Sequence, residues 1–131
     1  MVTVLTLSEA KKLPLECHRV DALSMEDPTY WEVSVQSPKL VTLAGMLIAE
    51  LSQGQHVYVN CRSGISRSVA VVLVWLLSKN YIDKSQLEDA VRLLDPDTDT
   101  TDRRIKNLNT KTRESIIDAA STALVLIFLG V

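Results

Sequence analysis

One cysteine, one glycine, one arginine and one serine stand at fixed spacing between two apolar stretches of the sequence. The segment "VYVNCRSGISRSVAVVLVWLL" (57–77) contains Cys61, Gly64, Arg67 and Ser68. Its pattern predicts a buried strand, a tight loop and a buried helix, in that order. Such a unit directs several backbone N–H groups and the positive end of a helix dipole at one point, which suits the binding of an oxyanion.

Each of these four side chains has a chemical reason to stand there. The dipoles that bind an oxyanion also stabilise a thiolate, and such sites lower a cysteine pKa from about 8.5 to roughly 3.5–7.5. Cys61 is therefore predicted to be a nucleophile at neutral pH. Arg67 can bind two phosphoryl oxygens at once, which a lysine cannot do. Gly64 can adopt a positive φ, and Ser68 can donate a hydrogen bond to the thiolate or to the departing group.

The same residues carry a resemblance to a known family. The run from Cys61 to Ser68 is similar to the C-x-x-G-x-x-R-[ST] phosphate loop of the protein tyrosine phosphatase superfamily, and most similar to its compact dual-specificity branch. The segments "VTVLTLSE" and "HRVDALSMED" occur in the order that this family shows upstream, whereas the C-terminal part matches less clearly. The resemblance implies a phosphate-binding loop made of Arg62, Ser63, Gly64, Ile65, Ser66 and Arg67.

The resemblance also implies a mechanism. The cysteine thiolate attacks phosphorus and forms a phosphocysteine, an aspartic acid on a separate loop protonates the leaving oxygen, and water hydrolyses the intermediate. In compact members of the family this acid lies upstream of the cysteine at a spacing that Asp27 matches, 34 residues before Cys61 and next to Pro28. Asp21 and Glu26 are the alternatives. Asp21 falls in a predicted strand and Glu26 precedes the turn, so neither is as free as Asp27 to move over a bound phosphate.

The residue before the nucleophile departs from the family pattern. The family usually has a histidine there, which hydrogen-bonds the loop and helps to keep the thiolate, but this chain has Asn60. An asparagine still donates and accepts hydrogen bonds. Without the imidazole, slower turnover and a phosphate-binding protein without catalysis are both open alternatives, although Cys61 and Arg67 favour activity.

Several other residues have a structural alternative to a functional role. The glycine and arginine spacing argues against Cys61 as an ordinary buried thiol. Cys17 is expected to be a buried structural cysteine rather than a thiol that protects Cys61 from oxidation. Tyr30 and Trp31 either flank a phosphoryl side chain or fix their loop to the domain. The acidic stretch 95–104 is predicted to be a solvated turn and helix cap.

The predicted elements place these residues in an α/β fold. β-branched and apolar content predicts strands over 2–7, 18–23 and 56–60. Strands that alternate with helices predict a single-domain sandwich, similar to cysteine phosphatases, with a mostly parallel central sheet flanked by helices. The segment 24–38 has no helical periodicity and is predicted to be an irregular surface loop.

Apolar residues at helical spacing predict four helices. The first begins at Ser37 and Pro38 and ends at Gly54. The others are predicted at positions with the same spacing of apolar residues, namely over 67–79, over 84–94 with Asp83 as its cap, and from about 102 to 120.

The apolar run 123–129 near the C-terminus is predicted to be an edge strand. Members of the resembled family usually begin with an edge strand that this chain lacks, and the Val, Ile and Phe content of the run suits a strand. Such a strand would also allow a weak dimer, because edge strands expose unpaired N–H and C=O groups. The alternative is that the preceding helix continues to the end of the chain and packs its apolar face on the core.

Length and composition limit the class of protein. With 131 residues, 47% of them hydrophobic, the chain can bury one core, so one domain over 1–131 is expected. The net charge of −2 gives no general attraction to nucleic acid. Two cysteines are too few for a disulfide framework, and the sequence has neither a signal-peptide pattern nor a membrane-spanning run. These features predict an intracellular protein, cytoplasmic or nuclear.

The predicted function is hydrolysis of phosphate monoesters on proteins. Phosphotyrosine is the expected substrate group, with phosphoserine and phosphothreonine as further ones, and neither a metal nor an organic cofactor is expected. Phosphoinositide phosphatases of the superfamily tend to carry lysines in the loop, where this chain has only Arg62 beyond Arg67. RNA triphosphatases are disfavoured by the acidic pI of about 5.6. A non-catalytic phosphoprotein-binding module is the alternative from another class.

Overall fold

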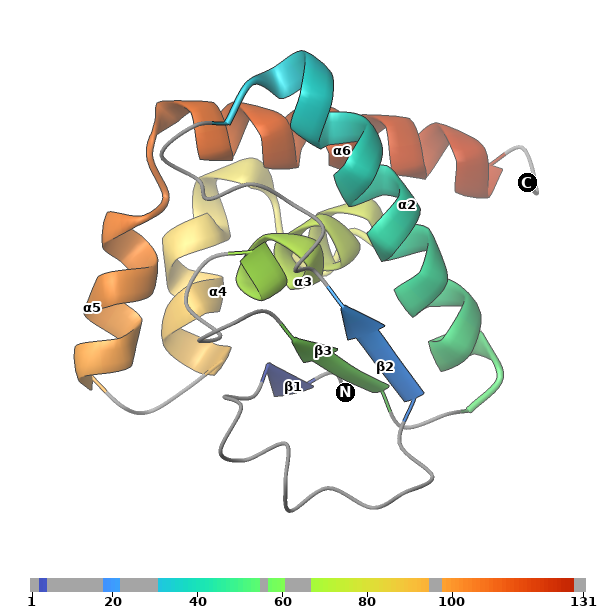
Figure 1. Cartoon of the computed structure of the whole chain (residues 1–131), viewed down its shortest axis with the longest axis horizontal. Coiled ribbons are helices and arrows are strands. Elements are labelled where there is room, and N and C mark those ends of the chain that lie inside the picture. The colour runs from blue at the N-terminus through green and yellow to red at the C-terminus, as the bar shows by residue number, and fades with distance from the viewer. Residues whose placement is uncertain are drawn as a thin grey trace.

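The computed structural model describes residues 3–4, 18–21, 31–54, 57–60, 67–94 and 98–128. Figure 1 shows the arrangement of the helices and strands in this part of the chain. In chain order they are β1 (Thr3–Val4), β2 (His18–Asp21), α2 (Val33–Ser52), β3 (Val57–Asn60), α3 (Arg67–Ser78), η3 (Lys84–Gln86), α4 (Leu87–Leu94), α5 (Thr98–Lys106) and α6 (Thr110–Phe128).

The three strands lie where the sequence predicts strands, and they form a small parallel sheet in the order β1-β3-β2. β3 is the central strand: Val4 of β1 pairs with Val59, and Asp21 of β2 pairs with Asn60. Because β2 and β3 run parallel and end at the same register position, the segments that follow them leave the sheet at the same edge.

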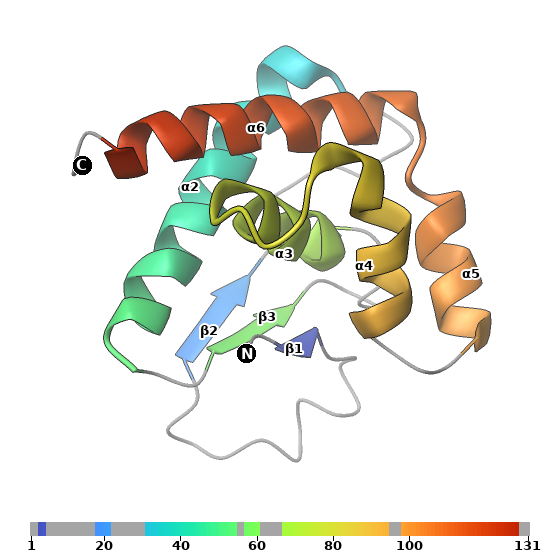
Figure 2. The same ribbon diagram turned by 180° about the vertical axis from the view of Figure 1, so that it is seen from behind.

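The predicted fold class, a sandwich around a central sheet flanked by helices, is wrong for the described part of the chain. Helices make up most of it, and the sheet is limited to strands of two to four residues. In both views the described helices lie on one side of this sheet (Figures 1 and 2). The physical reason is that the apolar stripes of the helices are buried mainly against one another, and the contact between α2 and α6 is the most extensive between described elements.

Helix α3 forms the centre of the core, as its sequence predicts. Every residue from Val69 to Val74 is at most 1% exposed. A helix that is apolar all round must be covered on all sides, and α3 contacts α2, α4, α6 and the sheet. Its first residue, Arg67, is therefore held by one of the most deeply buried elements of the molecule.

Helix α2 begins one turn earlier than predicted, so the loop predicted over 24–38 is wrong from residue 33 onward. The N–H groups of Val35 and Gln36 donate to the carbonyl oxygen of Glu32, at 3.0 and 2.9 Å, and Pro38 lies inside the helix. Burial of Trp31, which is 2% exposed, fixes the chain just before this first turn. Trp31 therefore belongs to the core, as the structural interpretation predicts, whereas Tyr30 lies outside the described residues.

The helical segment 84–94 is confirmed together with its cap. The N–H of Ser85 donates to Oδ1 of Asp83 at 2.9 Å, and the N–H of Asp83 donates to Oε1 of Gln86 at 2.9 Å, which completes a capping box. The segment starts as the short helix η3 and continues as α4, whose Leu87 and Val91 are buried.

The C-terminal third differs from the prediction in two ways. The predicted helix over 102–120 is two helices, α5 and α6, because Oδ1 of Asn109 accepts a hydrogen bond from the N–H of Thr112 at 2.9 Å and caps a new helix. Residues 98–104 belong to α5 rather than to a solvated turn, and the Arg104 side chain is buried. Residues 95–97 lie outside the described part.

The predicted C-terminal edge strand is wrong, because α6 continues to Phe128. Ala119, Ala120 and Ala123 are buried, and such small residues let α6 approach the core closely. The alternative, a helix that continues, is confirmed as far as residue 128, and its packing on the core is confirmed as far as Ala123. A dimer through a C-terminal strand consequently has no support. None of the helices in the described ranges combines the length and apolar character that crossing a bilayer requires.

Candidate active site

The described elements frame the candidate phosphate loop on both sides. β3 ends at Asn60 and α3 begins at Arg67, so the chain between them consists of the six residues 61–66. These six residues lie outside the described part of the chain: Cys61, Arg62, Ser63, Gly64, Ile65 and Ser66. The candidate acid Asp27 also lies outside it. The predicted strand before this segment and the predicted helix after it are both present.

The strand that leads to segment 61–66 buries two of its side chains in the core. Val57 and Val59 are buried, and Val59 has no exposed surface. These two side chains lie on the same face of the strand, so that face packs on the core. The backbone of Asn60 pairs with that of Asp21, which fixes the position of the residue before Cys61.

The helix that follows the loop segment begins with two candidate site residues. Arg67 is partly buried and Ser68 is fully buried, and both take part in interactions within the protein. The first N–H groups of a helix have no acceptor within it, and the first turn of α3 contains no acidic residue that would neutralise its positive end. This helix end can therefore stabilise an anion bound next to it.

The candidate acid segment is connected to the same edge of the sheet. β2 ends at Asp21, directly opposite Asn60, and residues 22–30 follow it. Trp31, four residues after Asp27, is buried in the core. The anchors of the acid segment and of the loop segment thus lie next to each other in the sheet. Of the alternatives, Asp21 has its backbone beside Asn60, whereas Glu26 lies outside the described residues.

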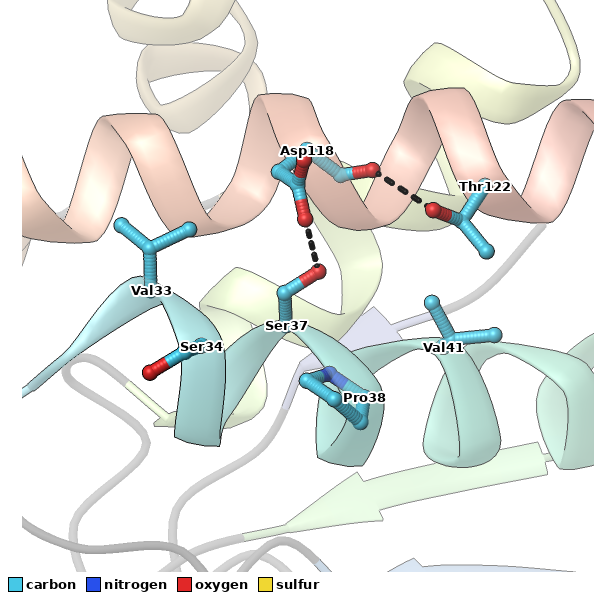
Figure 3. A pocket seen from close by; sticks show the side chains of 7 residues that line it. All are labelled: Val33, Ser34, Ser37, Pro38, Val41, Asp118 and Thr122. Carbon is cyan, nitrogen blue, oxygen red and sulfur yellow. Dashed lines mark hydrogen bonds between the residues drawn. The ribbon is translucent and has the colours of Figure 1, made fainter.

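The structure also contains polar features that apolar periodicity does not reveal. Gln36 has no exposed surface, and among the described residues neither its Oε1 nor its Nε2 has a hydrogen-bond partner. Next to it, Oγ of Ser37 donates to Oδ2 of Asp118 at 2.5 Å and joins α2 to α6 (Figure 3). The S-P pair at 37–38 suggests a helix start, but only the tertiary structure shows that Ser37 reaches a carboxylate 81 residues away.

A groove of about 320 Å³ lies beside this hydrogen bond, between α2 and α6. It is lined by residues remote in sequence from the candidate loop. Among the residues that the structure describes, no group of three or more histidine, cysteine, aspartate or glutamate side chains is placed to hold a metal ion.

Comparison of the chain with family models, with curated proteins and with solved structures gave no match in any of the three.

Proposed function

We propose that this protein is a cysteine-dependent phosphomonoester hydrolase that acts on phosphoproteins through a phosphocysteine intermediate. One observation carries the proposal: the segment Cys61–Ser66 stands between the end of the central parallel strand and the first residue of a buried helix, and that residue is Arg67. Ligands of parallel sheets bind outside the carboxyl ends of the strands, which is where this segment leaves the sheet.

The proposed first step transfers a phosphoryl group to sulfur. The Cys61 thiolate attacks phosphorus, a bond between sulfur and phosphorus forms, and the bond from phosphorus to the leaving oxygen breaks. Asp27 gives its proton to the leaving oxygen. Arg67 holds two of the equatorial oxygens with parallel hydrogen bonds, which strengthen as negative charge develops.

The second step returns the enzyme to its starting state. Asp27, now a carboxylate, accepts a proton from the attacking water, the new oxygen–phosphorus bond forms, and the bond to Cys61 breaks. The Ser68 hydroxyl stabilises the departing thiolate with a hydrogen bond. Inorganic phosphate then leaves the loop.

The described frame suits this chemistry because its central helix is deeply buried. A guanidinium that must hold a transition state gains from a backbone that does not move, and the backbone of Arg67 belongs to a helix whose next seven residues are all buried. Segments 22–30 and 61–66 follow strands that end at the same edge of the sheet. This supports the proposal that Asp27 acts together with Cys61.

A non-catalytic phosphoprotein-binding module is the second candidate, and Asn60 is the observation that favours it. An asparagine in place of the family's histidine removes an imidazole from the neighbourhood of the thiolate. Such a module would keep phosphate affinity through Arg67 and the helix end, without turnover.

The test compares hydrolysis rates on four substrates: a phosphotyrosyl peptide, a phosphothreonyl peptide, a phosphoinositide and a triphosphorylated RNA. Hydrolysis of the phosphopeptides is expected to be fastest. Cys61→Ser is expected to abolish it while binding of a phosphate analogue such as vanadate or tungstate persists, because a serine hydroxyl is not ionised near neutral pH. Substantial turnover by Cys61→Ser would refute the mechanism, and phosphate-dependent binding without turnover by the wild type would favour the binding module.

A further inference from the structure

The groove between α2 and α6 has an apolar wall and a negative edge. Val33, Pro38 and Val41 line it from α2, while Asp118 and Thr122 line it from α6 (Figure 3). Pro38 is exposed, and Val33 and Val41 are partly exposed, so apolar surface is open to solvent here. The groove holds about 320 Å³, enough for one or two aliphatic side chains but small for a folded partner.

The carboxylate at the edge of the groove is held by a hydrogen bond and has no ion-pair partner among the described residues. Oδ2 of Asp118 accepts the hydrogen bond from nearly buried Ser37, which orients the carboxylate toward α2. Within the described ranges no lysine or arginine forms an ion pair with Asp118, and exposed Glu114 lies one turn before it on the same helix face. The nearest cation on that face, Lys111, is two turns away, about 10 Å along the helix.

Helical spacing places one further exposed apolar side chain on α6 beyond Thr122. Val125 lies seven residues after Asp118, which places it on the same face of α6, and it is 56% exposed. Along this face of α6, therefore, the negative group is followed first by the exposed Thr122 and then by the exposed apolar side chain of Val125.

We infer that this groove is a docking site for a short extended peptide segment that carries a lysine or arginine two residues away from a leucine, isoleucine or valine. One turn of α6 separates Asp118 from Thr122, about 6 Å along the helix axis, and residues i and i+2 of an extended peptide are about 6.6 Å apart on one face. A cation next to Asp118 thus places the aliphatic side chain beside Val41 and Thr122.

Two other occupants fit the groove less well. A standard interface between copies of a protein uses about 20–30 residues on each side, far more than line this groove. An anionic membrane surface would be repelled by Asp118 and Glu114. A basic and aliphatic peptide satisfies both the carboxylate and the apolar wall.

The test measures binding of a fluorescein-labelled peptide, Gly-Ser-Lys-Ser-Leu-Ser-Lys-Ser-Gly, by fluorescence anisotropy. Its symmetry presents the lysine and leucine pair in either chain direction. Because this peptide carries no phosphate, the result is independent of the proposed phosphatase chemistry. The wild type is expected to bind it more tightly than two matched peptides, one with both lysines changed to glutamate and one with leucine changed to serine. Equal affinity for all three would overturn the inference.

Two variants locate the binding. Asp118→Asn keeps an acceptor for Ser37 but removes the charge, and affinity is expected to fall about two- to fivefold. Thr122→Lys places an ammonium one turn from Asp118 at an exposed position, where it neutralises the carboxylate and repels the peptide, and affinity is expected to fall about tenfold or more.

The matched control is Asp102→Asn, which removes an exposed carboxylate on α5, away from the groove, and is expected to bind as the wild type does. Circular dichroism of all variants checks that they are folded. Unchanged affinity in Thr122→Lys, or concentration-dependent dimerisation of the wild type that Thr122→Lys abolishes, would refute peptide docking; the second result would assign the groove to another copy of the chain.

Discussion

Arg67 is the residue whose side-chain chemistry can be tested most narrowly. Arg67→Lys keeps a positive charge at the first position of α3 but replaces a two-pronged guanidinium by a single ammonium. The rate of phosphopeptide hydrolysis is expected to fall by orders of magnitude, because one point charge cannot replace two parallel hydrogen bonds in the transition state.

The control for this variant is Arg103→Lys, which makes the same exchange at an exposed position on α5 and should leave the rate unchanged. Steady-state kinetics with one phosphotyrosyl peptide measures the hydrolysis rates of both variants. A loss of only a few-fold in Arg67→Lys would mean that the guanidinium does not bind the reacting phosphoryl group.

The role of Asp27 as general acid can be tested with substrates whose leaving groups differ in their need for a proton. Asp27→Asn should strongly slow the hydrolysis of alkyl phosphates, whose leaving oxygen needs a proton, and should spare much of the formation of the phosphoenzyme from 4-nitrophenyl phosphate. The rate constants of the first step for both substrates give the comparison. Equal losses on both substrates would instead indicate Asp21, Glu26 or a general loss of structure.

At the scale of elements, the first turns of α2 contain a buried amide that lacks hydrogen-bond partners among the described residues. Gln36 is fully buried with both ends of its amide unpaired among the described residues, which costs about 1–3 kcal/mol per group. Gln36→Met has similar length and helix propensity, and it should raise the free energy of unfolding by about 1–3 kcal/mol in urea titrations.

Gln53→Met, at the exposed end of α2, is the matched control and should change the free energy of unfolding by less than about 0.5 kcal/mol. If Gln36→Met destabilises the protein, the amide of Gln36 has a partner in the folded state and the unpaired assignment is wrong.

The cap of the segment 84–94 should make stability depend on pH. Hydrogen bonds from the side chain and then the backbone N–H of Ser85 lower the pKa of the Asp83 carboxyl. A carboxyl whose pKa is lower in the folded state adds stability above its unfolded pKa, about 4, and this contribution is lost as pH falls through the folded pKa.

Urea titrations of wild type and Asp83→Asn test this dependence, since asparagine can cap a helix but does not ionise. The wild type is expected to be the more stable of the two at neutral pH, and the difference should shrink as pH falls below about 4. A difference that stays constant from neutral to acidic pH would show that the charge of Asp83 plays no part.

Elements whose signals are local could be predicted from the sequence. β3, α3 and the capped segment 84–94 have continuous apolar runs or a cap next to the first turn, and all three are present. The start of α2 and the end of α6 could not be predicted, because both depend on packing. Burial of Trp31 stabilises the helical turn before Pro38, and buried alanines place β-branched residues such as Val125 in a helix rather than a strand.

At the scale of the whole molecule, the arrangement of layers could not be predicted from the order of elements. Alternating strands and helices are compatible with helices on both faces of a sheet, yet the described helices gather on one side (Figures 1 and 2). For the candidate site, the strand before Cys61 and the helix that starts at Arg67 were predictable because the motif fixes their spacing. The groove between α2 and α6 was not, since it joins residues 81 positions apart.

The most direct test of the central claim is to trap the phosphoenzyme. The Asp27→Asn variant is mixed with 4-nitrophenyl phosphate, quenched in acid within one turnover, and analysed by mass spectrometry of the intact protein and of its peptides. One phosphoryl group on Cys61 is expected, because this variant retains the nucleophile but activates water poorly. The double variant with Cys61→Ser should carry none. Turnover without any phosphoryl group on Cys61, or phosphate binding that is only reversible in the wild type and the variant alike, would contradict a phosphocysteine mechanism.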